Sequence, residues 1–365
     1  MVKKSASVMF VAPLKKWGGL ESDLVNLGKE FIRWGVSPEL LCIRGGDIPY
    51  PERMPEEFKV SQLKTRSKID GVPKLAKLLR RNPPGALITL KDHSAQIALA
   101  ARALSRVPVP IYVRVTSTLS IAAHRPMKRY MIRKLYPRAD RVIAISKGVA
   151  KDLVDNFSVP SKKIAVLYNP VVTEDFVGRS KLQVYHPWLQ RGFGVPVVMG
   201  AGRLDKTKDF TTLLEAFCIL RSRKKAKLII LGDGAERHLL ERRVCELGIA
   251  GDVDFPGQVD DILPYVSRAN VFALSSKYEG LGNVLVEAMA VGTPVVSTDC
   301  PHGPREILMG GLYGSLVPVG DSRGLANAML DMLDNPLNRN NFYDAIDRFR
   351  SERVAEEYLQ VMGFI

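Results

Sequence analysis

The sequence predicts two α/β domains in tandem, each built on a Rossmann-like, doubly wound parallel sheet, and we expect the two domains to face a cleft. In both halves of the chain, short apolar runs alternate with segments of helical periodicity, which is the pattern of a parallel sheet covered by helices. The length of 365 residues suits two domains of ordinary size. Residues 181–194 have no clear period and carry two glycines near their end, so we place the interdomain linker there.

The first domain is expected to span residues 1–180, and the second residues 195–338. Buried strands of the first domain are predicted at residues 7–13, 39–43, 86–90, 109–115, 141–145 and 163–168. Apolar residues recur at helical spacing from Leu20 to Trp34, and Gly35 suits the end of that helix. Strands of the second domain are predicted at residues 195–199, 227–231, 253–255, 271–275 and 294–298. Residues 339–365 are helical but follow no strand, so we expect them to pack back on the first domain.

The composition argues against a disordered, collagenous or membrane-spanning protein, because 46% of the residues are hydrophobic and 25% are charged. No apolar run reaches about 18 residues, and the apolar stretch from Val8 to Pro13 is too short for a secretory signal. We therefore expect the protein in the cytoplasm. The four cysteines are widely separated, which predicts reduced thiols and neither a disulfide framework nor a zinc site.

The net charge of +15 lies entirely in the first half of the chain. Residues 1–180 hold 32 Lys and Arg against 15 Asp and Glu, whereas residues 181–365 hold 21 against 23. Such asymmetry indicates an anionic partner for the first domain. The densest stretch, residues 124–141, alternates basic with bulky apolar side chains. As a helix, this stretch suits the surface of an anionic bilayer, and a solvated face is the alternative.

Residues 275–292 are the most informative segment for function, because they leave a predicted strand, turn through glycines and enter a helix. The backbone N–H groups at the start of that helix belong to Gly282, Asn283 and Val284. Such a helix start binds anions, so a phosphate would fit there. Glu279 and Glu287 add two carboxylates beside this anion site, which suits sugar or ribose hydroxyls. The alternative is that Glu279 caps the helix and Glu287 is a surface residue.

A second glycine-rich turn, at residues 200–210, carries two cations that could meet the same anion. Arg203 and Lys208 lie five residues apart in this loop. A planar guanidinium and an ammonium together can neutralise a diphosphate whose charge grows as a bond breaks. The alternative is that both are solvated loop cations. In the first domain, Gly18 and Gly19 open a helix after the first strand, and we interpret this turn as a second approach to the phosphates or as ordinary turn chemistry.

Together these residues resemble the retaining GT-B glycosyltransferases of family 4. That family carries a Glu, seven residues, Glu motif, which Glu279 and Glu287 fit. The other matching segments are G-R-L-D-K-T-K-D-F at 202–210, L-G-D-G at 231–234, F-P-G-Q-V at 255–259 and A-M-A-V-G-T-P-V-V at 288–296. The resemblance covers nearly the whole chain and is looser in the first domain.

The resemblance implies a role for each matching position. Arg203 and Lys208 would bind the donor diphosphate and act in catalysis, Glu287 would bind the ribose, and Glu279 the sugar hydroxyls. The main chain near Val259 would meet the base, and Gly282, Asn283 and Val284 would supply backbone donors. Gly19 would close on the phosphates from the first domain, with Gly18 beside it on the acceptor side. The final helix would cross back to the first domain.

The acceptor side departs from the family pattern. Phosphatidylinositol mannosyltransferases have a His after the fifth strand of the first domain, and residues 112–116 contain none. His93 is the nearest candidate to orient the sugar or the acceptor, and Arg114 could bind an acceptor phosphate; an incidental His beside a capping Asp92, and a surface Arg, are the alternatives. Asp252 and Asp254 form a D-x-D that precedes a strand, at the wrong end of the sheet for a metal-bound diphosphate. We expect no metal and no cofactor.

These observations predict sugar transfer from a UDP- or GDP-type nucleotide-diphosphate sugar to an acceptor hydroxyl, with retention. A glycan or lipid-linked acceptor at the inner face of the cytoplasmic membrane would account for the basic first domain. A nucleotide-sugar 2-epimerase is the alternative within the same architecture. Nucleic-acid binding is the non-enzymatic alternative, but the sequence has no helix-turn-helix, zinc pattern or aromatic stacking strip.

Overall fold

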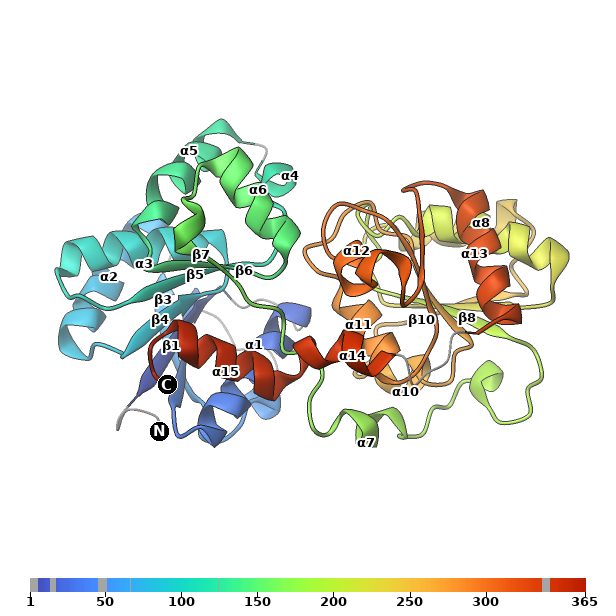
Figure 1. Ribbon diagram of the computed structural model, residues 1–365, viewed down its shortest axis with the longest axis horizontal. Helices are drawn as coiled ribbons and strands as arrows, with labels where there is room; N and C mark the ends of the chain where they lie inside the picture. The colour runs from blue at the N-terminus through green and yellow to red at the C-terminus, as the bar shows by residue number, and fades with distance from the viewer. Residues whose placement is uncertain (1–5, 14–17, 45–50, 66, 124, 337–341) are drawn as a thin grey trace. The chain divides into compact units, whose positions relative to one another are not determined.

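The computed structural model describes residues 6–13, 18–44, 51–65, 67–123, 125–336 and 342–365. The chain divides into two compact units (Figure 1). Unit 1 comprises the chain up to Val171 together with Phe349–Ile365, and unit 2 comprises Val172–Arg348. Each unit contains one sheet in which all the strand pairs are parallel. The predicted fold class is therefore confirmed.

Unit 1 holds a seven-stranded sheet in the order β3-β2-β1-β4-β5-β6-β7. Its strands are β1 Ser7–Ala12, β2 Ser37–Arg44, β3 Lys59–Thr65, β4 Ala86–Thr89, β5 Ile111–Val115, β6 Arg141–Ala144 and β7 Ile164–Val166. Its helices are α1 Gly19–Arg33, α2 Lys68–Arg81, α3 Asp92–Ser105, α4 Leu119–Ala122, α5 Pro126–Leu135, α6 Lys147–Phe157 and α15 Ser351–Val361. The chain order reverses between β1 and β4, which is where ligands bind in an open α/β sheet.

Unit 2 holds a six-stranded sheet in the order β10-β9-β8-β11-β12-β13. Its strands are β8 Val197–Ala201, β9 Lys227–Leu231, β10 Val253–Gly257, β11 Val271–Leu274, β12 Val295–Thr298 and β13 Ser315–Val317. Its helices are α7 Phe176–Ser180, α8 Phe210–Arg223, α9 Arg237–Glu246, α10 Leu263–Val266, α11 Asn283–Ala290, α12 Pro304–Ile307, α13 Ser322–Asp334 and α14 Tyr343–Ile346. The order reverses between β8 and β11, so the loops after these two strands flank the ligand position.

The last helix, α15, packs on α1 within unit 1 (Figure 1). Phe31 of α1 lies between Phe10 of β1, at 5.9 Å between ring centroids, and Tyr358 of α15, at 6.5 Å. Ser351 at the start of α15 donates a hydrogen bond of 2.8 Å from its hydroxyl to the buried carboxylate of Glu30. The tail therefore completes the core of unit 1, although it follows the whole of unit 2 in sequence.

The division between the units differs from the predicted boundaries at residues 180 and 338. Residues 172–194, which include the predicted linker 181–194, belong to unit 2 because polar contacts tie them to it. Arg179 forms an ion pair of 2.8 Å with Asp261, and His186 Nε2 lies 2.9 Å from Asp254 Oδ2. At the other boundary, α14 packs on α11 in unit 2, so only Phe349–Ile365 of the predicted tail returns to unit 1.

Candidate functional site

Lys208 and Glu279 meet at the carboxyl ends of β8 and β11, where the strand order of the second sheet reverses. Lys208 Nζ lies 2.5 Å from Glu279 Oε1, and the two side chains are only 17% and 12% exposed. Ser276 donates a hydrogen bond of 2.6 Å from its hydroxyl to the same carboxylate oxygen. The fold thus brings together a cation and a carboxylate that lie 71 residues apart in the sequence. The other predicted cation of the loop, Arg203, is largely exposed and pairs instead with Asp205 at 2.5 Å.

Asp205 shapes the loop that carries both cations. Its carboxylate accepts hydrogen bonds from the backbone N–H of Thr207 at 2.9 Å and from the Thr207 hydroxyl at 2.5 Å. Burial acts to raise the pKa of Asp205, but these hydrogen bonds and the charge of Arg203 outweigh it, so the pKa is lowered. The carboxylate is therefore charged at neutral pH and fixes the turn between Arg203 and Lys208.

The start of α11 provides the expected anion position. Gly282 precedes the helix with φ +99°, a left-handed conformation that favours glycine. The N–H groups at the start of a helix point outward along its axis, where the helix dipole favours an anion. Glu287 lies one turn further along α11 and is half-buried. The predicted anion position and the predicted ribose carboxylate are therefore on one helix, directly after Glu279.

The loop after β12 supports this turn from the neighbouring strand. The backbone N–H of Glu279 donates to the carbonyl of Pro301 at 3.3 Å. Gly303 has φ +92°, and a Cβ at this position would lie 1.8 Å from the carbonyl oxygen of Leu281. Cys300 is buried beside Glu279, and burial together with the charge of that carboxylate raises the pKa of its thiol to about 12. Cys300 is therefore a protonated packing residue at neutral pH.

We expect Gly303→Ala to destabilise unit 2 and to weaken ligand binding at the α11 turn. The positive φ alone costs an alanine about 1–2 kcal/mol, and the contact with Leu281 adds about 1–3 kcal/mol. Gly310→Ala is the matched control, because Gly310 also has a positive φ of +73° but open space around the Cβ position. Denaturant unfolding of both variants measures the difference. Equal stabilities would show that Gly303 is not held against Leu281.

In unit 1, the predicted residues lie at the carboxyl ends of β1 and β4. Gly18 precedes α1 in an extended conformation, and Gly19 is the first residue of that helix; both are exposed. His93 lies in the first turn of α3 and is half-buried. Its neighbour Asp92 does not simply cap the helix, because its carboxylate accepts hydrogen bonds from Gln96 at 3.1 Å and from the Tyr136 hydroxyl at 3.2 Å.

The prediction that Arg114 binds an acceptor phosphate does not fit the structure. Arg114 is only 3% exposed, and its guanidinium donates to the Asp23 carboxylate at 2.7 Å and to the Asn169 side-chain oxygen at 2.8 Å. Burial acts to lower the pKa of Arg114, but Tyr358 and Asp23 raise it overall, so the group is charged. Arg114 therefore ties β5 to α1 inside the core. Its burial depends on α15, which no local sequence pattern indicates.

The D-x-D residues make structural polar contacts at the amino end of β10. Asp252 pairs with Arg221 at 2.7 Å and with Lys227 at 2.8 Å, and Asp254 contacts His186. The partial burial of Asp252 acts to raise its pKa, but its two cationic partners outweigh this and lower it. The absence of a metal at the diphosphate remains a prediction.

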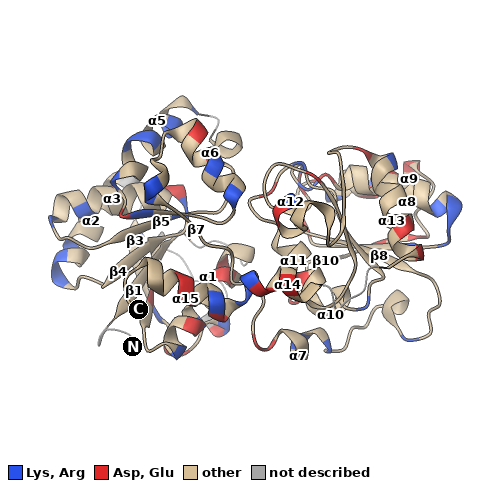
Figure 2. Cartoon of the chain, viewed as in Figure 1, with Lys and Arg blue, Asp and Glu red and all other residues tan. Residues whose placement is uncertain are grey.

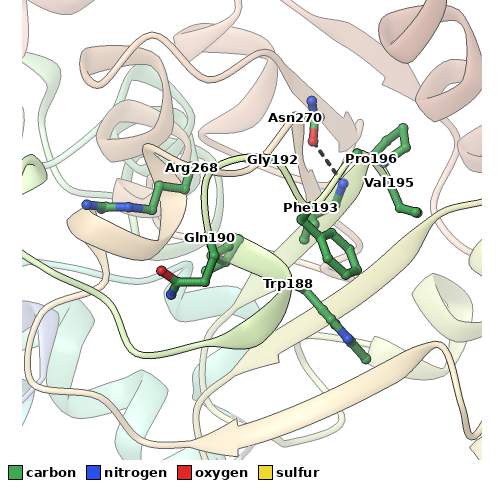
Figure 3. A pocket seen from close by; sticks show the side chains of 11 residues that line it. Trp188, Gln190, Gly192, Phe193, Val195, Pro196, Arg268 and Asn270 are labelled. Carbon is green, nitrogen blue, oxygen red and sulfur yellow. Dashed lines mark hydrogen bonds between the residues drawn. The ribbon is translucent and has the colours of Figure 1, made fainter.

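A pocket of about 320 Å³ lies at the opposite end of the second sheet, before β8 and β11 (Figure 3). Trp188, Phe193 and Arg268 contribute to its lining, and the Asn270 side chain accepts a hydrogen bond of 2.9 Å from the backbone of Val197. Arg268 donates to the carbonyls of Ser180 and Pro264, so its guanidinium holds the backbone of this region. None of the predicted site residues lines this pocket.

The sequence comparisons assign the chain to a family. The model of the family described as Glycosyl transferases group 1 matches residues 195–335, and that of Glycosyltransferase Family 4 matches residues 17–175. Among solved structures, HepE from Anabaena in complex with UDP and glucose has a TM-score of 0.82 at 19% identity, covering 99% of this chain and 100% of that chain. The lipopolysaccharide outer core galactosyltransferase WaaB has a TM-score of 0.76 at 21% identity, covering 98% and 99%. These likenesses define the GT-B fold.

The chain belongs to the family 4, or group 1, glycosyltransferases, which confirms the resemblance seen in the sequence. One relative, from Campylobacter jejuni, is an N-acetylgalactosaminyltransferase acting on a diphospho-undecaprenol-linked sugar, 32% identical over 64% of this chain. Another, the lipopolysaccharide core biosynthesis glycosyltransferase LpsE of Rhizobium meliloti, is 38% identical over 46% of it. The matches span 63% and 50% of those relatives' own lengths.

Proposed function

We propose that this protein transfers a sugar from a nucleotide-diphosphate sugar to an acceptor hydroxyl, with retention at the anomeric carbon. The observation that carries the proposal is the Lys208–Glu279 pair beside the start of α11, at the point where the second sheet reverses its strand order. A half-buried ammonium next to a helix start suits a diphosphate, and a carboxylate that also accepts a hydroxyl hydrogen bond suits a sugar.

In the proposed reaction, the anomeric carbon–oxygen bond to the diphosphate breaks while the acceptor oxygen bonds to that carbon on the same face. The acceptor proton passes to the departing diphosphate oxygen. Lys208 and the N–H groups at the start of α11 stabilise the growing negative charge. Arg203 contributes to this stabilisation when its guanidinium moves from Asp205 to the diphosphate. Glu279 orients the sugar hydroxyls and Glu287 the ribose. Rate enhancement then comes from positioning and electrostatics rather than from a protein nucleophile.

The acceptor in this proposal is a lipid-linked glycan of cell-surface polysaccharide, lipopolysaccharide or glycolipid assembly. Two relatives support this class, since one acts on an undecaprenol-linked sugar and another takes part in lipopolysaccharide core biosynthesis. Such acceptors lie at a membrane. Within the described residues, no helix is both long enough and apolar enough to cross a bilayer. We therefore propose peripheral docking on the inner face of the cytoplasmic membrane.

Helix α5 is the surface we propose for this docking, and lysines and arginines cluster along it (Figure 2). Met127 is 69% exposed and Tyr130 is 55% exposed, one turn apart on the helix. Two basic residues of α5 attach the helix to unit 1: Arg133 donates to the carbonyl of Asn156, and Arg129 lies over the Phe157 ring at 4.9 Å. The outer face thus offers apolar side chains flanked by exposed cations, as an anionic interface requires.

We expect the protein to float with anionic vesicles and not with neutral ones. Removing Met127 and Tyr130 (both to Ser) with Arg125 and Lys134 (both to Gln) should reduce vesicle binding more than ten-fold, because each basic residue contributes about 1 kcal/mol near the surface. A variant with Lys181→Gln and Lys225→Gln loses the same charge from exposed sites in unit 2. Equal recovery of both variants, or of the natural protein on both vesicle types, would contradict docking through α5.

The transferase and the 2-epimerase differ in what they do with the donor alone. We expect a thermal-shift panel of nucleotide sugars to identify one donor that stabilises the protein, by about 2.7 kcal/mol at one hundred times its Kd. With that donor, labelled sugar should appear in lipid-linked acceptor only when acceptor is added. Conversion of the donor sugar without acceptor would instead establish the epimerase, and stabilisation by duplex DNA but no nucleotide would establish nucleic-acid binding.

A further inference from the structure

Arg179 forms a partly buried ion pair in unit 2, outside the segments that resemble the glycosyltransferase family. It lies on α7 (Phe176–Ser180), which packs against α10 (Leu263–Val266) (Figure 1). Its Nε donates a hydrogen bond of 2.8 Å to Asp261 Oδ2. The other carboxylate oxygen of Asp261 accepts from the backbone N–H of Leu263 at 3.0 Å, at the start of α10. Arg179 therefore fixes the chain that follows β10.

Two parts of the proposed donor site lie next to this guanidinium. Asp261 is two residues beyond Val259, whose main chain is proposed to meet the base. Glu287, proposed to bind the ribose, is close enough for its charge to act on Arg179. Burial acts to lower the pKa of Arg179, but the hydrogen bond and charge of Asp261, with smaller contributions from Asp175 and Glu287, raise it. A charged guanidinium is thus hydrogen-bonded to the loop after β10.

We propose that Arg179 is a positioning residue for the nucleoside of the donor: through its hydrogen bond with Asp261 it sets the loop after β10, which is proposed to meet the base. This inference rests on the proposed function. It separates the nucleoside half of the site, organised by Arg179, from the diphosphate half, organised by Lys208 and the start of α11. If Arg179 only anchored residues 172–194 to unit 2, replacing it would lower the stability of the unit but would not weaken nucleotide binding relative to pyrophosphate binding.

Another ion pair in unit 2 provides a closely matched control. Arg221 Nε lies 2.7 Å from Asp252 Oδ2, and the Arg221 side chain is 39% exposed and that of Asp252 19%. In the Arg179–Asp261 pair the distance is 2.8 Å, and the side chains are 37% and 21% exposed. Asp252 precedes β10, at the end of the sheet away from the proposed donor site. R179M and R221M therefore each remove one ion pair of similar length and exposure at opposite ends of the same sheet, and Asp252 keeps its second partner, Lys227, in R221M.

The test is calorimetric titration of the full chain with UDP, with GDP and with inorganic pyrophosphate. We expect the natural protein to bind one of the two nucleotides, and R179M to bind that nucleotide about ten-fold more weakly, the usual cost of one charge-assisted hydrogen bond. Pyrophosphate affinity should be unchanged in R179M, and R221M should match the natural protein with every ligand. R179K should recover part of the nucleotide affinity, because it keeps a cation that can pair with Asp261.

Each contrary result identifies what is wrong. Nucleotide affinities equal in R179M and R221M, or an equal loss of pyrophosphate affinity in R179M, would overturn the role of Arg179 while leaving the proposed function intact. R179K binding as weakly as R179M would contradict a role that acts through the ion pair with Asp261. A natural protein that binds neither nucleotide would overturn the proposed function itself. If R179M does not fold, D261N breaks the same pair while keeping an acceptor for the Leu263 N–H, and the same outcomes apply.

Discussion

Replacing Lys208 by Met is expected to slow sugar transfer by about 100- to 1000-fold, the usual cost of removing one group that stabilises a growing negative charge. The Lys208 side chain is only 17% exposed, so water screens its charge little. Its partner Glu279 keeps the hydrogen bond from Ser276, so the carboxylate stays in place when the ammonium is removed. Single-turnover rates at saturating donor measure the effect on the chemical step.

Lys206→Met is the control for this prediction, because Lys206 is exposed in the same loop, two residues away. We expect that variant to transfer sugar within a few-fold of the natural rate. Unfolding curves of both variants should overlap, which separates a catalytic effect from a loss of folded protein. Full activity of Lys208→Met, or equal losses in the two variants, would contradict the assignment of Lys208 to the departing diphosphate.

Replacing Arg114 by Met should destabilise unit 1 by about 3–5 kcal/mol, the usual result of removing one partner of a buried ion pair. Arg114 and Asp23 are 2% and 6% exposed at the side chain, so the carboxylate left behind would be buried without a compensating charge. The pair joins β5 to α1, and Tyr358 of α15 lies beside it. Denaturant unfolding with a probe in unit 1 measures the loss.

The double variant Arg114→Met with Asp23→Leu separates the charge from the packing. Because both charges are gone, no uncompensated carboxylate remains, and we expect most of the lost stability to return. Vesicle binding should be unchanged, since α5 is not part of this pair. A single variant as stable as the natural chain, or a double variant less stable than the single one, would show that Arg114 and Asp23 are not paired in the core.

Most of the fold follows from local pattern, because a strand buried on both faces must be apolar throughout. Every predicted strand overlaps an observed one, but β3 and β13 were not predicted. Both lie at sheet edges, where β3 has mostly half-exposed residues and β13 has only three residues. Edge strands bury less apolar surface, so their sequences carry a weaker signal. The division between the units at Val172 differs from the predicted boundary near residue 180, since an ion pair with Asp261, 82 residues further along the chain, holds α7 to unit 2.

The residues of the candidate site, too, were only partly predictable from the sequence. Lys208 and Glu279 were predictable because each follows a strand at the reversal point, and parallel strands place their following loops at one edge. Ser276 was not predicted, although its partner Glu279 lies only three residues away in the same loop. Gly303 and Arg179 were not predicted because their contacts are with other loops. Of these three residues, only Gly303 has a signal in the sequence, which is a glycine in the loop that follows a predicted strand. The burial of Arg114 could not be predicted, because a cation within a strand has the same local sequence whether solvent or α15 covers it.

The most direct test of the account is a crystal structure of the protein with UDP or GDP, whichever the natural chain binds. We predict that the diphosphate lies against Lys208 and the N–H groups at the start of α11, with the ribose hydroxyls on Glu287. A nucleotide bound elsewhere, such as in the pocket before β8, with Lys208 still paired to Glu279 alone, would contradict it.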